Sequence, residues 1–289
     1  MRSAMLAVFD WDTARAPKGL ESLKSLQHHH TGLKTDSERR HSEELCREVI
    51  DHAVEHHRGH VVKSRQLGSG NGFAFEGGPY CSYAHRDGIH ALFSGEVSKW
   101  PGLDLVSASH NAFVSSEEKS EQNEAHWLLD FYQGLEVVFD CDAILESLAQ
   151  IEGRFGFVLY DERRKRVMAS RDALGAEDLY WGVTEEGQLL LGTSAVDLDG
   201  CEPSAVTFPS GTLYVSQGDT VAENPGERGW VIAGNRWPGR LLSFVKGEEN
   251  AWRHVKEIPR VTSRGTLCGA VYRVDSERDL EGRGNFGSV

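Results

Sequence analysis

The clearest hydrophobic pattern in the chain begins at Glu152, in the stretch EGRFGFVLYDERRKRVMASRDALGAEDLYWG. Large apolar side chains recur along 155–160, a charged run follows, and apolar residues return at 167–169, which predicts two strands joined by a charged turn. The segment 171–175, RDALG, ends the second strand with a glycine, and the aromatic run Leu179–Trp181 predicts a third. Three strands this close in sequence predict an antiparallel sheet.

Other parts of the chain also show strand patterns bounded by turn residues. The apolar run Met5–Phe9 predicts a buried strand, and Ser69–Gly72 predicts a hairpin turn between strands. The segment around Gly95 and Glu96 is expected to end the sheet that precedes the next helix. The remaining predicted strands lie at Val61–Val62, Phe73–Phe75, Tyr80–Tyr83, Ile89–Phe93, Gly187–Gly192, Gly211–Val215 and Thr266–Val274.

Three segments have helical patterns. Thr35 and Glu38 have the spacing of a capping box, and an apolar line then recurs every four residues until Gly59. Two further amphipathic helices are predicted at Glu121–Leu135 and Asp142–Ile151. The apolar line of the first helix is expected to consist of Leu45, Val49 and Ala53.

The order of these elements does not alternate strand and helix, so a doubly wound parallel sheet is disfavoured. Strands in runs with helices in pairs predict an α+β sandwich, in which sheets pack on one another between helical layers. We expect one domain over residues 5–275 and a disordered tail over 276–289, which is rich in Glu, Arg and Gly.

Composition excludes several functions. A net charge of −13 argues against a nucleic-acid partner, and no apolar run reaches the roughly 20 residues of a membrane span. No GxxxxGK[ST] phosphate loop occurs, so nucleotide binding is not predicted and no cofactor is predicted. The short apolar run before Asp10 is not a signal-peptide core, and the five scattered cysteines fit reduced thiols, which predicts a cytoplasmic or nuclear protein.

Histidines are concentrated in the first sixty residues. His28–His30 form a triplet, and His52 and His56 lie one helical turn apart, where a pair could hold zinc if a third ligand came from elsewhere. Histidines on a helix are more often solvated or hydrogen-bonded, so no metal site is predicted. A metal-buffering role for this region remains one of three functional hypotheses.

Several ordered motifs resemble those of a known family. The stretch Asp142–Gly182 carries LxxLxxIxGxFxFxLYD followed by SRDALGxxxLYWG, and it resembles the glutaminase domain of type-2 glutamine amidotransferases such as asparagine synthetase. The start MLAVFD, the segment Phe93–Glu96 and the later Phe208–Gly211 match in the same order. This resemblance, over residues 5–217, implies the four-layer αββα sandwich of the N-terminal-nucleophile hydrolases.

A plant group of amidotransferase-like proteins, the stem-specific or aluminium-induced proteins, is similar over most of the chain. The similarity includes the segments Asn123–Ala125, Pro259–Val261 and Leu267–Ala270. Two motifs of that group are replaced here by NAFV at 111–114 and LEVV at 135–138, so partners of the plant proteins need not transfer. About seventy residues follow the matched region, too few for a synthetase domain.

The resemblance also identifies the positions of the family's reacting groups. Leu6 stands where active members have the nucleophilic cysteine, whose α-amine acts as base. Ser94 stands at the oxyanion-binding Asn, Gly95 keeps its backbone amide, and Glu124 stands at the substrate-binding Asp. The expected pocket therefore consists of Leu6, Ser94, Gly95 and Glu124, with no catalytic residue. Arg86 does not match the family's carboxylate-binding Arg in its flanking residues.

The sequence thus predicts a non-catalytic amidotransferase-like protein that binds a small metabolite or a protein partner, in a response to stress or growth signals. The alternative is a hydrolase with an unrecognised nucleophile, such as Ser94 or an internal cysteine. Arg171 and Asp172 are expected to fix a turn rather than to form a catalytic pair. Cys268 is expected to be a buried, unreactive thiol.

Overall fold

A computed structural model describes most of the chain. The described residues are 4–17, 19–20, 34–57, 61–101, 123–135, 141–198, 200–201, 205–216, 239–247, 250–261, 263–265 and 267–275. The predicted tail, the triplet His28–His30 and the segment 111–114 lie outside these ranges, as does the side chain of Cys268.

One antiparallel sheet, which we call the first sheet, is built around the buried strand at the start of the chain. In the described residues it has six strands in the order β10-β8-β9-β1-β3-β2. The hairpin turn between β2 and β3 is made by Ser69 and Gly70, both with positive φ. Its strands are β1 (Met5–Phe9), β2 (Val62–Gly68), β3 (Asn71–Glu76), β8 (Tyr180–Val183), β9 (Leu189–Gly192) and β10 (Val206–Thr207).

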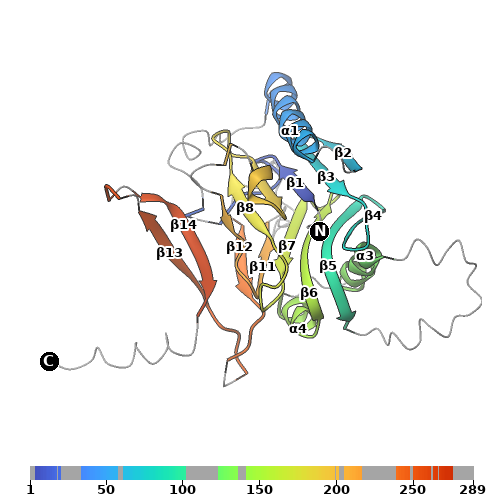
Figure 1. Cartoon of the computed structure of the whole chain (residues 1–289), viewed down its shortest axis with the longest axis vertical. Coiled ribbons are helices and arrows are strands. Elements are labelled where there is room, and N and C mark those ends of the chain that lie inside the picture. The colour runs from blue at the N-terminus through green and yellow to red at the C-terminus, as the bar shows by residue number, and fades with distance from the viewer. Residues whose placement is uncertain are drawn as a thin grey trace, which may run out of the picture.

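The second sheet contains the predicted hairpin. Over the described residues it also has six antiparallel strands, in the order β12-β11-β7-β6-β5-β4. Figure 1 shows the two sheets face to face, with β5, β6 and β7 side by side in the second. Its strands are β4 (Cys81–Arg86), β5 (Ile89–Lys99), β6 (Glu152–Asp161), β7 (Arg166–Arg171), β11 (Thr212–Val215) and β12 (Arg240–Ser243).

Two predictions about these strands were wrong. Strand β5 does not end at Gly95 and Glu96 but runs to Lys99, because β6 starts early enough to pair with it as far as Glu152. Strand β8 does not join the hairpin: it pairs with β9 and β10 in the first sheet. The pattern identifies a strand but not its partner, which here depends on packing of the fully buried Trp181 near Phe208 and Tyr214.

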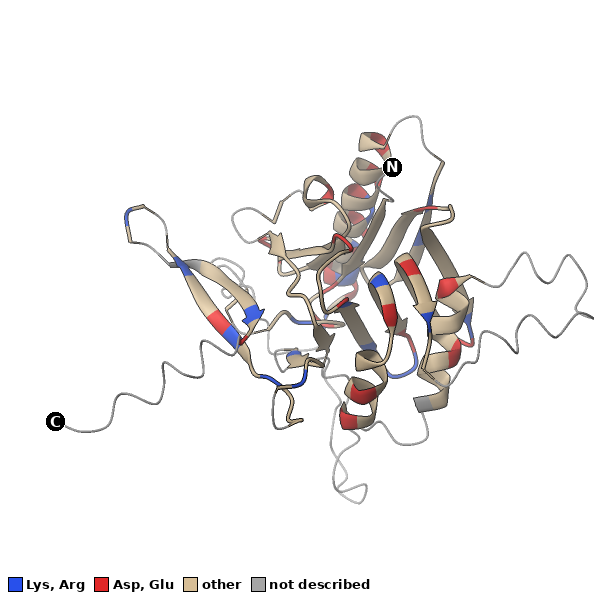
Figure 2. Cartoon of the chain, turned by 60° about the horizontal axis from the view of Figure 1, so that its bottom comes forward, with Lys and Arg blue, Asp and Glu red and all other residues tan. Residues whose placement is uncertain are grey.

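Helices cover the outer faces of both sheets, which confirms the predicted αββα sandwich. Helix α1 (Asp36–His56) packs on β1, β2 and β3, whereas α3 (Glu124–Leu135) packs on β4 and β5. Leu148 of α4 (Cys141–Ala149) joins Phe155 and Phe157 in the apolar layer outside the second sheet. Asp and Glu residues occur along these helices, in keeping with the negative net charge (Figure 2). Among the described residues, no helix is both long and apolar enough to cross a membrane.

A two-stranded ribbon, β13 (Val255–Val261) and β14 (Leu267–Val274), projects from the sandwich (Figure 1). The predicted strand near the end of the chain is thus present as β14. At the base of the ribbon, Tyr272 lies against Trp181, with 5.9 Å between ring centroids, and its hydroxyl donates to the carbonyl of Pro17. The ribbon is therefore attached to the inter-sheet core.

The buried face of α1 differs from the predicted one. The side chains that face β1 and β3 are Cys46, Ile50 and Ala53, while Leu45 and Val49 lie half-buried beside them. The helix approaches the sheet closely at Gly72, where a Cβ would lie 2.5 Å from Ile50 Cδ1. The predicted line of three apolar residues did not identify the buried face of the helix, because that face also includes the polar Ser42 and the small Cys46.

The capping box at the start of α1 is confirmed. The Thr35 hydroxyl accepts from the Glu38 amide at 3.3 Å, and a Glu38 carboxylate oxygen accepts from the Thr35 amide at 2.7 Å. We expect Thr35→Ala to lower the free energy of unfolding by about 1 kcal/mol in urea denaturation, because the N-terminal amides lose this partner. Ser37→Ala, in the same exposed turn, should change it by less than about 0.5 kcal/mol, and equal losses would contradict the capping role.

Candidate functional site

The turn after β7 is organised by the carboxylate of Asp172. One oxygen accepts from the amides of Leu174 and Ala176 at 3.1 and 2.9 Å, and the other accepts from those of Glu177 and Phe155 at 2.9 and 3.4 Å. Asp172 is almost fully buried, and a buried carboxylate is stable only where hydrogen bonds replace its hydration. These four amides fix the turn against the start of β6.

Arg171 closes the same turn from the other side. Its guanidinium donates to the carbonyls of Glu177, Phe208 and Gly175 at 2.6, 3.0 and 2.8 Å. The two charged neighbours thus bind backbone groups, which confirms that they fix a turn. Their effect is to hold Glu177 at one place between the sheets.

Glu177 faces Ser94 of β5. The Ser94 hydroxyl donates to a Glu177 carboxylate oxygen at 2.5 Å, and Ser94 is fully buried. Burial raises the pKa of Glu177, against the opposing effects of the Ser94 hydrogen bond and of Arg154, whose guanidinium lies 4.0 Å away. Cys81 pairs with Ser94 across β4 and β5, and its thiol donates to the carbonyl of Ala4 at 3.4 Å. This polar cluster therefore lies beside the start of β1.

Gly95 occupies a tight position next to this cluster. Its backbone amide donates a hydrogen bond to the carbonyl of Tyr80 at 2.9 Å. This N–H group, which would bind an oxyanion in an active site, therefore already has a partner within the protein. Its φ is +118°, and a Cβ there would lie 2.2 Å from the carbonyl oxygen of Arg154. The glycine is needed for backbone geometry.

Leu6 lies in a different layer from Ser94. Its side chain packs with Val8, Ile50 and Leu198 between the first sheet and α1, and it is 1% exposed. The neighbouring Met5 amide donates to the Thr193 hydroxyl at 2.9 Å inside the sheet. The structure thus brings β1 near β5 but turns the Leu6 side chain away from Ser94.

Glu124 and Arg86 lie on the helix-covered side of the second sheet. Glu124 is partly exposed in the first turn of α3, where the preceding Asn123 side chain accepts from the amide of His126 at 3.2 Å and caps the helix. Arg86 donates to Asp130 at 2.5 Å and to Gln133 at 2.9 Å on that helix. Of the four predicted pocket residues, the structure places only Ser94 and Gly95 together.

Sequence reasoning missed the residues that surround Ser94. Glu177 stands in a polar turn, and Arg154 and Cys81 stand in strands with no motif to mark them. Only the long-range contacts between β5, β6 and the turn reveal that these side chains meet.

The histidines on α1 make ordinary contacts. The rings of His52 and His56 lie 4.1 Å apart between centroids, and His57 is 3.0 Å from the carboxylate of Asp197. Within the described part of the chain, no group of three or more potential ligands is arranged to hold a metal ion.

Two other buried polar groups stabilise the sandwich. Asp10 forms an ion pair with Lys34, and burial, reinforced by Asp12, raises its pKa to about 7. His90 contacts the Tyr83 hydroxyl and the Glu162 carboxylate, each at 2.8 Å, and burial lowers its pKa. Each of these two side chains is buried and binds other side chains of the protein, so neither marks an accessible reaction site.

Two antiparallel sheets packed face to face between helical layers define the class of αββα sandwich proteins. The chain belongs to the family described as Aluminium induced protein, whose model matches residues 6–233.

Curated relatives are enzymes that share part of the chain. An amidase, chry2, from Gibberella zeae is 26% identical over 65% of this chain and 29% of its own length. The glutamine-hydrolysing asparagine synthetases of Zea mays and Asparagus officinalis are 37% and 41% identical over 27% of this chain and 15% of their own length. The chain thus spans less than a third of these relatives.

Among solved structures, the glutamine phosphoribosylpyrophosphate amidotransferase of B. subtilis aligns with 84% of this chain and 50% of its own. The identity is 11% and the TM-score is 0.42.

The buried carboxyl of Glu177 predicts a pH dependence. The folded protein holds this proton more tightly than the unfolded chain, whose Glu pKa is about 4.3, so the group's contribution to stability is lost as pH rises through the raised folded value. We expect the free energy of unfolding of wild type to fall more than that of Glu177→Gln as pH rises from about 4 through the raised pKa of Glu177. Urea denaturation at each pH measures this.

Glu186→Gln provides the matched control, because Glu186 is an exposed residue of the turn after β8. Its pH dependence should follow that of the wild type. If Glu177→Gln also followed the wild type, the buried carboxyl would not be the source of the effect.

Proposed function

We propose that this chain is a non-catalytic glutamine amidotransferase-like protein that acts by binding a small molecule or a protein partner in a stress or growth response. The observation that carries the proposal is the state of the oxyanion-binding segment. The Gly95 amide is bound to Tyr80, and the Ser94 hydroxyl is bound to Glu177 in a fully buried position. Catalysis of acyl transfer needs donors aimed at the developing oxyanion.

The position of the nucleophile supports the same proposal. Leu6 carries no nucleophilic atom, and its side chain fills the apolar layer beneath α1. In active amidotransferases a thiol and a free amine react at this point. An aliphatic side chain at this position instead adds to the hydrophobic packing of β1.

The nearby thiols support it as well. Burial raises the pKa of both Cys81 and Cys46 to about 12, so both remain protonated near neutral pH. Because the thiolate is the reactive form, these cysteines resemble buried structural thiols rather than nucleophiles.

The relatives bear on this proposal only in part. Hydrolysis of glutamine is named for the asparagine synthetases, and this chain matches 15% of their length. The family description, Aluminium induced protein, supports a role in a stress response.

Incubation of the purified chain with glutamine tests the proposal. We expect no glutamate above the buffer background, measured by a coupled glutamate dehydrogenase assay beside an active asparagine synthetase. Glutamate release that disappears in Ser94→Ala, with unchanged folding by circular dichroism, would contradict the proposal.

The hydrogen bond between Ser94 and Glu177 favours one alternative, a hydrolase with Ser94 as nucleophile and Glu177 as base. Complete burial of Ser94 opposes this alternative. When the protein is treated with a fluorophosphonate probe and its intact mass is measured, we expect no covalent adduct, whereas a reactive Ser94 would add about one label per chain. Ser170→Ala, another buried strand serine, is the matched control. Labelling of wild type and Ser170→Ala but not of Ser94→Ala would establish the alternative.

A further inference from the structure

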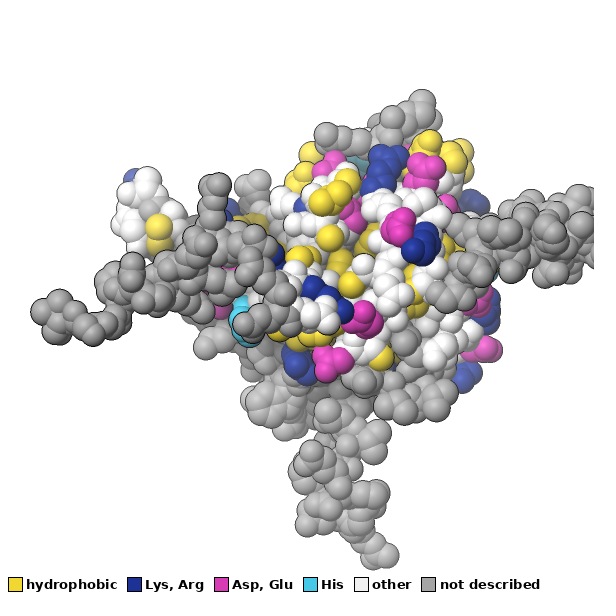
Figure 3. Space-filling model, turned by 90° about the horizontal axis from the view of Figure 1, so that it is seen from below, with side chains coloured by type: hydrophobic (Ala, Val, Ile, Leu, Met, Phe, Trp, Pro, Cys, Tyr) yellow, Lys and Arg dark blue, Asp and Glu magenta, His cyan; other side chains and the backbone are white. Residues whose placement is uncertain are grey.

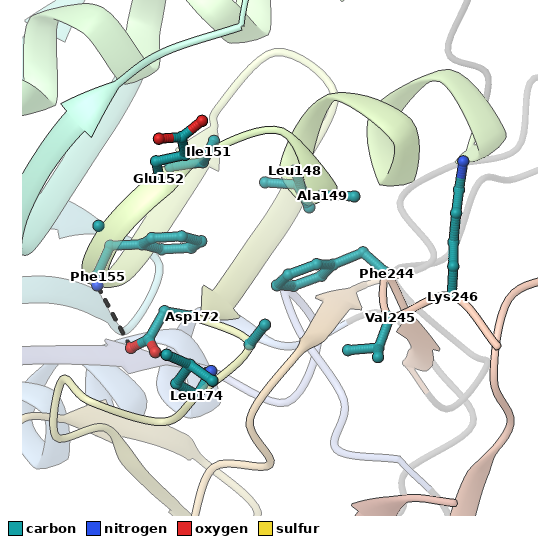
Figure 4. Close-up of a pocket in the computed structure, with 12 residues that line it drawn as sticks. Leu148, Ala149, Ile151, Glu152, Phe155, Asp172, Leu174, Phe244, Val245 and Lys246 are labelled. Carbon is teal, nitrogen blue, oxygen red and sulfur yellow. Dashed lines mark hydrogen bonds between the residues drawn. The ribbon is translucent and has the colours of Figure 1, made fainter. Parts of the chain in front are cut away.

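A cavity of about 450 Å³ lies on the opposite face of the second sheet from Ser94. It is enclosed by the end of α4, the start of β6, the turn after β7 and the segment after β12 (Figure 4). Its size falls within the roughly 300–1,000 Å³ of small-molecule sites. Its apolar lining includes Leu148, Ala149, Phe155, Ala173, Leu174 and Phe244.

The inner wall of the cavity is aromatic. The rings of Phe155 and Phe244 lie nearly parallel, at 19°, with 6.5 Å between their centroids, and Leu148 completes the buried floor. Ring faces and edges of this kind favour contact with another aromatic ring. The wall therefore suits a planar apolar group.

The charged side chains around the cavity already have partners. The carboxylate of Asp172 accepts the amides of its own turn. Glu152 pairs with Lys99 at 2.8 Å, and Lys246 pairs with Glu146 at 2.7 Å and lies over the Trp252 ring. One acidic and one basic rim residue, each neutralised, provide no net charge to attract an ion. A charged ligand would lose hydration without gaining a free partner.

The mouth of the cavity exposes apolar surface. Leu174 is 91% exposed although it belongs to the lining, and the adjoining Ala173 and Ala149 are also exposed. Seen from below, the face of the molecule carries hydrophobic side chains between separated basic and acidic ones (Figure 3). A bound molecule that covered Leu174 would remove this surface from water.

We propose that this cavity binds a small, uncharged aromatic molecule. The inference deepens the proposed binding function and rests on it, because it identifies where a ligand would bind and of what chemical class. The site is separate from the family's reaction centre, since Phe155 and Ser94 face opposite sides of the second sheet.

Indole serves as the probe, with saturation-transfer NMR and titration of the full chain. We expect saturation of the indole protons by wild-type protein, and binding at least about tenfold weaker in Ala149→Phe and Ala173→Phe, whose rings would fill the cavity. Ala143→Phe is the matched control, because Ala143 is exposed on the same helix but outside the lining. It should bind indole as wild type does.

Three results would overturn the inference: no indole binding by wild type at millimolar concentration, unchanged binding in both filled variants, or benzoate binding as tightly as indole. Phe244→Leu keeps an apolar wall but removes one ring, so it should weaken indole binding. Near-ultraviolet circular dichroism confirms that each variant is folded.

Failure here is distinguishable from failure of the proposed function. Glutamate release tests whether the chain is catalytic and involves Ser94, whereas indole binding involves the other face of the sheet. An inactive chain that does not bind indole would leave the non-catalytic assignment standing and remove only the cavity as its ligand site.

Discussion

The carboxylate of Asp172 accepts four backbone amides at the point where β7 leaves the second sheet and the chain crosses to the first. Hydrogen bonds to an ionised acceptor are stronger than those between neutral groups, and burial makes their loss costly. One of these amides belongs to Phe155 on β6 and another to Glu177, so a single carboxylate sets the relative position of both. The polar cluster at Ser94 and the cavity beside Phe155 therefore share one support.

That support comes from backbone groups and buried side chains of the turn itself. The turn, the two sheets and their helical layers depend on buried backbone hydrogen bonds and apolar packing, and Leu6 is itself part of the packed layer between the first sheet and α1. Gly95 is required by its positive φ and by the close approach of β6. Motifs that resemble an active site can thus be maintained by folding alone.

Shifted pKa values in this protein follow burial more than they mark reaction chemistry. Asp10, Cys46, Cys81 and Glu177 all have raised pKa values for which burial is the largest cause. Asp10 has Lys34 as its partner and Glu177 has Ser94, as expected for polar groups within a packed core. Such groups are functional candidates only where geometry provides access, and Ser94 is fully buried.

Local pattern in the sequence was sufficient for the β6–β7 hairpin, for the capped start of α1 and for the turn at Arg171 and Asp172, because each is formed largely by contacts between near neighbours. Strand β1 was recognisable from its unbroken apolar run, although its partners β3 and β9 lie far along the chain. Motif order was sufficient for the sandwich. Only the tertiary structure decided that β8 leaves the hairpin's sheet, that α1 buries Cys46 and Ile50, and that Glu177 meets Ser94. These depend on packing between segments far apart in the chain, and a periodic pattern carries no information about which surface will cover it.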